Sequence, residues 1–260
     1  MRLAKRYPHD SSPRGVFITA TDTGVGKTLV ASALVTRLIQ RGIDVGVMKP
    51  IETGVSRSAK AWSDGMRLRR AVGSDDPMAE VCPYVFRLPV APLSAARADR
   101  TTVQIATIMR AFRTLSQIHA FMAVEGVGGV HVPVTSSLDI SDLIYQMKLP
   151  VVVVGRSGLG GINHALLTLH ALRLRKIPVV ALVLNQCRPV SRKIARAQEQ
   201  STVSLLRMLA GVPVIGPLPY SPSVTRNWDE GLVRLAKTAP ITKLVRLVLA
   251  SARGTRSRRS

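Results

Sequence analysis

The chain has 260 residues, of which 46% are apolar and only 4% are aromatic. This length fits one large α/β domain whose core is built from aliphatic side chains. The 37 Lys and Arg against 15 Asp and Glu give a net charge of +22, which raises the question of a polyanionic partner. The longest apolar runs, 149–154 and 177–184, are shorter than the ~20 residues of a membrane-spanning helix, so we expect no membrane association.

The basic residues are spread through the sequence without interleaved aromatic residues. This distribution favours a solvated basic surface that attracts anionic substrates, and we expect no specific nucleic-acid partner. An unspecific, salt-sensitive affinity for polyanions is the open alternative.

The two ends of the sequence are basic and lack the periodicity of a packed element. We interpret residues 1–14 as a loose N-terminal arm, because two prolines interrupt them and no apolar stretch of a secretory signal is present. Residues 253–260 are expected to be a disordered Arg-rich tail, which leaves 15–252 as the single domain. Cys82 and Cys187 have no second thiol at metal or redox spacing, which is typical of a cytoplasmic protein.

Short apolar or β-branched runs alternate with segments of helical periodicity along most of the chain. The predicted strands are 16–20, 45–48, 121–124, 151–154, 179–184 and 212–215. Helices are predicted at 31–40, 102–115, 191–209 and 241–252, with a further apolar stripe over 162–169. This order predicts a doubly wound, mainly parallel α/β sheet, whose ligands lie at the carboxyl ends of its strands.

The segment after the first predicted strand, residues 19–28, reads Thr-Ala-Thr-Asp-Thr-Gly-Val-Gly-Lys-Thr. A strand, a Gly-rich loop and a helix in this order are typical of a phosphate-binding P-loop, in which Gly24 and Gly26 let backbone N–H groups turn toward phosphate oxygens. Lys27 is predicted to reach the β and γ phosphates of ATP. The hydroxyl of Thr28 is predicted to lie where Mg²⁺ bridges those phosphates.

Four further motifs follow the loop. They are Met-Lys-Pro-Ile-Glu-Thr-Gly at 48–54, Val-Glu-Gly-Val-Gly-Gly at 124–129, Gly-Leu-Gly-Gly-Ile-Asn-His at 158–164 and Val-Leu-Asn at 183–185. Together with the loop they resemble the dethiobiotin synthetase family over roughly 16–220. The resemblance implies a P-loop NTPase fold, a homodimer, and an ATP- and Mg²⁺-dependent ligase of biotin synthesis.

The reaction that this resemblance implies joins CO₂ to 7,8-diaminononanoate and closes a ureido ring, while ATP becomes ADP and phosphate. One amine captures CO₂ as a carbamate, the carbamate attacks the γ-phosphate, and the second amine expels phosphate. Because the carbamate and the phosphoryl group are both anionic, fixed cations must lie between them. By resemblance, Lys49 and Lys27 are the catalytic residues, with Lys49 at the carbamate, and Thr53 contacts the diamine.

The Mg²⁺ ion requires oxygen ligands, for which Thr28, Asp64 and Glu125 are the candidates. Glu125 ends an apolar strand at the position that a Walker-B acid takes. Asp64 lies in a weakly matching segment, and its alternative role is to cap the helix that contains Leu68.

The resemblance also implies a set of ATP-binding residues. Asn185 is placed at the adenine, since its amide both donates and accepts, although an Asn at a strand end is also typical of a turn. The complete set is Gly24, Val25, Gly26, Lys27, Thr28, Leu29, Asp64, Glu125, Gly126, Val127, Gly128, Asn185, Gln186, Leu218, Pro219 and Tyr220.

A second anion site is predicted at 158–163, where the backbone N–H groups of a helix start suit the carboxylate of the nonanoate. In the family this region contributes to a substrate site at a dimer interface, so Gly161 and Asn163 are predicted substrate contacts. Asn163 alternatively caps the helix. Residues 89–94 resemble a family loop near the diamine.

The sequence also departs from the family pattern in places. Ala20 and Thr21 stand where glycines are usual, and the charge is unusually basic. A partition-type ATPase that binds DNA non-specifically shares the superfamily fold and is the alternative function. Such proteins usually carry a second lysine early in the loop, where this chain has 21–23, and an aspartate in place of Glu125-Gly126. The motifs therefore favour the ligase.

Overall fold

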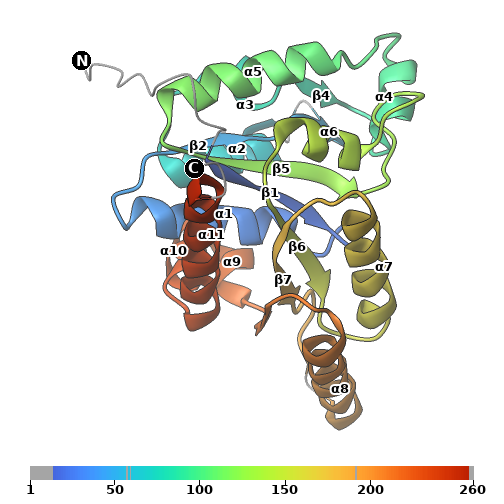
Figure 1. The fold of residues 1–260 in the computed structure, drawn as a ribbon, viewed down its shortest axis with the longest axis vertical. Helices are drawn as coiled ribbons and strands as arrows, with labels where there is room; N and C mark the ends of the chain where they lie inside the picture. Colours follow the sequence, from blue (N-terminus) through green and yellow to red (C-terminus); the bar gives the residue numbers. More distant parts are fainter. Residues whose placement is uncertain (1–13, 57, 59, 191, 258–260) are drawn as a thin grey trace.

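The computed structural model describes residues 14–56, 58, 60–190 and 192–257. Its centre is a six-stranded sheet in which all neighbouring strands are parallel, in the order β2-β5-β1-β6-β7-β8 (Figure 1). This confirms the predicted doubly wound, mainly parallel α/β fold and all six predicted strands. The strands are β1 Gly15–Ala20, β2 Val45–Met48, β5 Phe121–Gly129, β6 Val151–Arg156, β7 Val179–Asn185 and β8 Val214–Leu218.

Two short strands form a separate parallel sheet. They are β3 (Ile51–Thr53) and β4 (Tyr84–Phe86), and neither was predicted from the sequence. Three residues are too few to show the alternation by which a strand is recognised in a sequence.

Eleven α-helices are present in the described residues, together with a 3₁₀ turn at Lys60–Trp62. The five predicted helical segments correspond to α1, α5, α7, α8 and α11, and none of the described helices is long and apolar enough to span a membrane. The helices are α1 Lys27–Ile39, α2 Asp64–Val72, α3 Met78–Val81, α4 Pro92–Ala98, α5 Ile105–Ile118, α6 Ile140–Met147, α7 Gly161–Leu174, α8 Lys193–Leu209, α9 Pro222–Arg226, α10 Trp228–Ala236 and α11 Ala239–Ser257.

The predicted N-terminal arm lies almost entirely outside the described residues, whereas residues 253–257 of the predicted disordered tail are described and are helical instead. Residues 1–13 of the expected arm and 258–260 of the expected tail are outside the described residues. The last helix, α11, continues to Ser257, five residues past its predicted end at 252.

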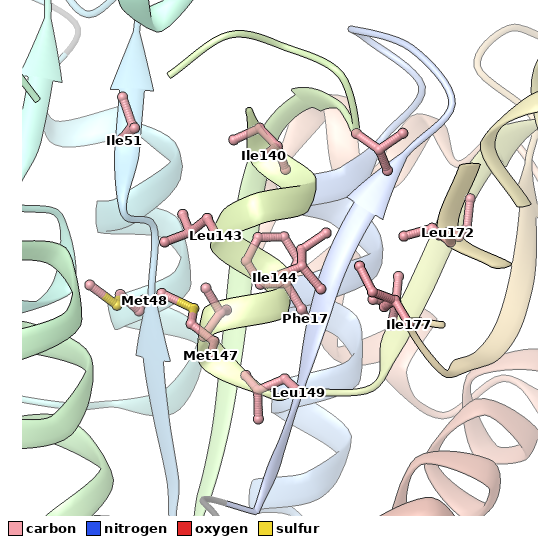
Figure 2. Packing of buried hydrophobic residues seen from close by; sticks show 14 of the residues in the cluster. Phe17, Met48, Ile51, Ile140, Leu143, Ile144, Met147, Leu149, Leu172 and Ile177 are labelled. Atoms are coloured by element: carbon pink, nitrogen blue, oxygen red, sulfur yellow. The ribbon is translucent and has the colours of Figure 1, made fainter. Parts of the chain in front are cut away.

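The core forms two layers, one on each face of the large sheet. Along β1, Phe17 packs into one hydrophobic cluster while Val16 and Ile18 pack into the other. Figure 2 shows the first cluster, which contains Phe17 of β1 and Ile144 of α6. Because strands covered on both faces bury every side chain, the near-continuous aliphatic runs in the sequence follow from this architecture.

The strand order places a topological switch point at β1. The chain leaves β1 for β2 on one side of the sheet, whereas β6, β7 and β8 extend the sheet on the other side. Connections that diverge in this way open a crevice at the carboxyl ends of the strands, where ligands of doubly wound sheets bind. The predicted phosphate loop follows β1 at this point.

We predict that His119 stabilises the fold in a pH-dependent way. Its ring nitrogens lie 2.8 Å from Asp44 Oδ1 and 3.0 Å from Asp76 Oδ2. Burial lowers the pKa of His119, but these two carboxylates outweigh burial and raise it above its ordinary value. The stabilisation is therefore complete below the unfolded-state pKa and is lost as pH rises through the folded-state pKa.

The measurement is urea unfolding of His119→Gln and the unsubstituted protein. We expect the substitution to lower the free energy of unfolding by about 1 kcal/mol more at about pH 5.5 than at about pH 8.5. A cost that is equal at both pH values contradicts the charged pairing.

Candidate active site

The phosphate loop turns sharply between β1 and α1. Gly26 is the residue before α1 and has φ 96°, a left-handed conformation that disfavours side chains. A Cβ atom on Gly26 would also collide with the side-chain amide of Asn185. The loop is joined to the sheet by a hydrogen bond from the Thr21 N–H to the Val154 carbonyl, at 2.9 Å. The positive end of α1 thus faces the space where the predicted phosphates lie.

A buried cluster of charges lies next to this loop. Lys49, which follows β2, is 2% exposed, and Glu125 of β5 is 0% exposed. The Lys49 ammonium donates to Glu125 Oε1 at 2.6 Å, to Asp64 Oδ2 at 3.0 Å and to the Gly126 carbonyl at 3.1 Å. Thr28 donates its hydroxyl to the same Glu125 oxygen at 2.8 Å. Thr28 of the phosphate loop and Lys49 therefore bind the same oxygen of Glu125.

The electrostatics of the cluster keep its charges paired. Burial lowers the pKa of Lys49, but Glu125 and Asp64 outweigh burial and hold it above its ordinary value. Burial would raise the pKa of Asp64, yet the Lys49 ammonium lowers it overall. Burial raises the pKa of Glu125. Lys27 has no hydrogen bond to a carboxylate among the described residues, and burial, followed by the nearby charge of Lys49, lowers its pKa to about 8.

The N-terminus of α2 positions Asp64. Glu52 of β3 accepts hydrogen bonds from the Asp64 N–H at 2.5 Å and the Gly65 N–H at 3.1 Å. Ser63 is the N-cap, with its hydroxyl accepting from the Met66 N–H at 3.3 Å. The alternative that Asp64 is the cap is therefore wrong, and the Asp64 side chain points to Lys49 instead. Glu52 stands in the 48–54 motif, but no role was predicted for it from the sequence.

A cavity of about 580 Å³ brings half of the predicted residues together. Of the predicted set, Gly24, Gly26, Lys27, Thr28, Leu29, Lys49, Thr53, Asp64, Val127 and Gly128 line it. Pro89 to Pro92, in the segment expected near the diamine, line it as well. Val25 instead packs in the core, while Glu125 and Gly126 reach the site through the Lys49 ammonium.

The predicted adenine residues lie at the ends of β7 and β8, outside the lining of this cavity. Asn185 donates its amide to the Val25 carbonyl at 3.0 Å, while its Oδ1 is buried without a partner among the described residues. Gln186 accepts from the Tyr220 N–H at 2.9 Å and donates to Glu199 at 2.6 Å. Its side chain therefore supports the loop after β8, which begins with the predicted Pro219 and Tyr220 and follows the predicted Leu218, the last residue of the strand.

The start of α7 is also separate from the cavity. Gly160, in a left-handed conformation, precedes the helix, so the alternative that Asn163 caps it is wrong. Asn163 is exposed. A Cβ atom on Gly161 would collide with the Arg156 carbonyl, which gives this glycine a packing role. Within one copy of the chain, neither predicted substrate contact of α7 lines the cavity.

One wall of the cavity was missed in the sequence. Trp228 lines it at the start of α10, and the Arg67 guanidinium of α2 lies 4.4 Å from the centre of the Trp228 ring. Their 161-residue separation in the chain left no local pattern to find. The aromatic ring itself was the available signal, since the chain has only two Trp.

These observations define a P-loop nucleotide-binding protein: a parallel sheet, a phosphate loop after β1, a Gly-Lys-Thr helix start and an acid on β5. The family described as AAA domain matches residues 14–227. The ATP-dependent dethiobiotin synthetase of Anaeromyxobacter dehalogenans strain 2CP-C is 40% identical over 222 residues, which cover 82% of this chain and 93% of that protein. The chain belongs to the dethiobiotin synthetase family.

Other relatives carry the same name. The protein of the same name from Thermodesulfovibrio yellowstonii is 40% identical over 82% of this chain and 91% of its own length. The Bacillus licheniformis protein is 35% identical over 79% and 86%. Among solved structures, the ParA family ATPase of Chlorobium tepidum TLS matches with a TM-score of 0.49 and 14% identity, covering 92% of this chain and 98% of that chain. The family predicted from the motifs, an ATP-dependent synthetase, is confirmed, and the partition-type alternative is not better supported.

We predict that removing the Glu52 carboxylate destabilises the protein. Glu52 is buried and satisfies two backbone donors, so Glu52→Ala should lower the free energy of unfolding by about 2 kcal/mol. Urea unfolding measures this, with Glu230→Ala on the surface as the control. Equal stability of Glu52→Ala and the control is the result that rules out this role.

Proposed function

We propose that this chain catalyses the ATP-dependent carboxylation and ring closure of 7,8-diaminononanoate with CO₂, giving dethiobiotin, ADP and phosphate. The observation that carries the proposal is the Lys49 ammonium, which lies at the end of β2 in the same cavity as the phosphate-loop residue Lys27. Family membership supports it independently. The two lysines border one space in which an anionic acceptor and a phosphoryl group can meet.

The chemistry requires these cations. An amine of the substrate attacks CO₂ and loses a proton, which leaves a carbamate anion. A carbamate oxygen then attacks the γ-phosphorus of ATP, releasing ADP, and the second amine attacks the activated carbonyl carbon and expels phosphate. Lys27 holds the phosphates of the leaving ADP, and Lys49 draws the carbamate toward the γ-phosphate by neutralising its charge. Thr53, on β3, lines the same cavity and contacts the diamine.

The residues present fit a Mg²⁺ ion. Glu125 Oε2 is buried and has no hydrogen-bond partner among the described residues, which leaves a carboxylate oxygen free for a cation. The Thr28 hydroxyl and Asp64 carboxylate supply two further hard oxygens beside it. Thr28, Asp64 and Glu125 would hold the ion, and when bound it would neutralise charge on the ATP phosphates.

We further propose that the active form is a homodimer that works in the cytoplasm, where ATP is available and the free thiols of Cys82 and Cys187 stay reduced. Leu159, Leu167 and Leu174 are 76%, 60% and 71% exposed, and the last two lie two turns apart on α7. A second copy covering this face would bring Gly161 and Asn163 to the partner's cavity, which explains why they do not line their own.

The proposed reaction predicts a large effect of replacing Lys49. In Lys49→Ala, diamine-dependent ADP release should fall by about 10²-fold or more, because a cation at the reacting centre is lost. The assay compares ADP release in ATP, Mg²⁺ and bicarbonate with and without the diamine, with dethiobiotin detected by mass spectrometry. The control is Lys237→Ala on the surface. If ADP release ignores the diamine and responds to DNA instead, the ligase assignment is wrong.

The proposed dimer predicts an effect of replacing Leu167. Leu167→Glu should weaken self-association by about tenfold or more and lower diamine-dependent turnover with it, because it places a charge in an apolar contact. Light scattering after gel filtration measures the mass. Ile194→Glu, which changes a residue of α8 that is 74% exposed, is the matched control. A fully active monomer contradicts the shared site.

A further inference from the structure

Two side chains at neighbouring strand ends hold the phosphate loop. Arg156, the last residue of β6, and Asn185, the last residue of β7, are register partners in the sheet. Arg156 donates to Asp22 Oδ2 at 2.5 Å, and Asn185 donates to the Val25 carbonyl at 3.0 Å. One contact thus fixes the beginning of the loop and the other fixes its end.

The negative charge of Asp22 needs a partner in this loop. A carboxylate in a loop that receives the phosphates of ATP repels them unless a cation neutralises it. Its Oδ1 accepts from the Thr23 N–H at 2.7 Å, and its backbone carbonyl accepts from the Lys27 ammonium at 3.4 Å. The Asp22 backbone therefore adjoins the phosphate cavity, whereas its side chain lines a neighbouring cavity next to α7, and Arg156 is its ion-pair partner.

The backbone of Arg156 is itself held in place. Its carbonyl packs against Gly161, where a Cβ atom would collide with it, and the next residue, Ser157, donates its N–H to the Asn185 carbonyl at 3.1 Å. The Arg156 guanidinium therefore extends from a fixed position at the end of β6. Because the guanidinium is planar, it limits the rotation of the Asp22 carboxylate.

We propose that Arg156 is a positioning residue for ATP, which acts through Asp22 by neutralising its charge and fixing the first half of the phosphate loop. The side chains of the pair are 37% and 43% exposed, and partly exposed ion pairs add little to folding stability. We therefore expect the Arg156–Asp22 pair to affect nucleotide affinity more than folding stability. The inference rests on ATP binding alone and does not depend on the identity of the acceptor.

The test is the affinity for MgADP, measured by calorimetry, together with thermal unfolding. Arg156→Met should weaken MgADP binding by about tenfold, because an uncompensated carboxylate then lies in the loop that binds the phosphates. Asp22→Asn should change the affinity by about twofold or less, since the charge to be neutralised is gone. In the double variant Asp22→Asn/Arg156→Met, the affinity should return to within about threefold of the original.

The double variant separates this role from direct contact. If the Arg156 guanidinium itself bound phosphate, the double variant would bind MgADP as weakly as Arg156→Met, and the proposal would be overturned. Unchanged affinity in Arg156→Met overturns it as well. Arg156→Gln, which keeps a polar head without charge, should show the same loss and provides the test if the methionine variant does not fold.

Arg175 offers a matched control. Its ion pair with Asp142 has the same 2.5 Å length and a similarly exposed arginine, at 36%, but it joins the end of α7 to α6. Arg175→Met should leave MgADP affinity unchanged. Equal losses in Arg156→Met and Arg175→Met would show a general effect of removing a positive charge and would overturn the proposal. Because MgADP binding needs no diamine, failure here is distinct from failure of the ligase assignment.

Discussion

The buried ammonium of Lys49 is the interaction on which the rest of the site depends. Removing charges from water is costly, and such charges are tolerated only when each one is paired and hydrogen-bonded. Lys49 meets this condition through Glu125, Asp64 and the Gly126 carbonyl, while its own N–H donates to the Val81 carbonyl at 2.7 Å. The end of β2, the middle of β5 and the start of α2 can therefore not shift independently, which holds the cavity in shape.

Charge is distributed unevenly between the site and the remaining surface. Although basic residues exceed acidic ones by 22, four of the 15 acidic residues lie at or beside the phosphate loop: Asp22, Glu52, Asp64 and Glu125. Each is compensated locally, by an arginine, a helix N-terminus or Lys49. The positive charge elsewhere remains to attract anionic substrates from solution, whereas the acids near the loop organise cations within the site.

The sequence could predict the features that depend on local pattern. The strands of the large sheet are buried on both faces and show as aliphatic runs, and Gly26-Lys27-Thr28 is identified by its place between a strand and a helix. Contacts between distant segments were missed. Glu52 acts on a helix that begins 12 residues later, and Trp228 meets Arg67 from α10. Nothing in the residues around Gln186 indicates that its amide is used by Glu199 and Tyr220.

Two different sheets contribute residues to the lining of the cavity. The phosphate side is built from the strand ends of the large sheet, whereas Thr53 and the segment from Pro89 to Pro92 belong to or adjoin the small β3–β4 sheet. The two sheets share no hydrogen-bonded strand pair within the described residues. Apart from Glu52, whose carboxylate holds the start of α2, residues of the small sheet can therefore change without directly altering the strand ends that carry the phosphate loop. In evolutionary terms, an enzyme of this design can change its acceptor substrate while its ATP-binding residues stay the same.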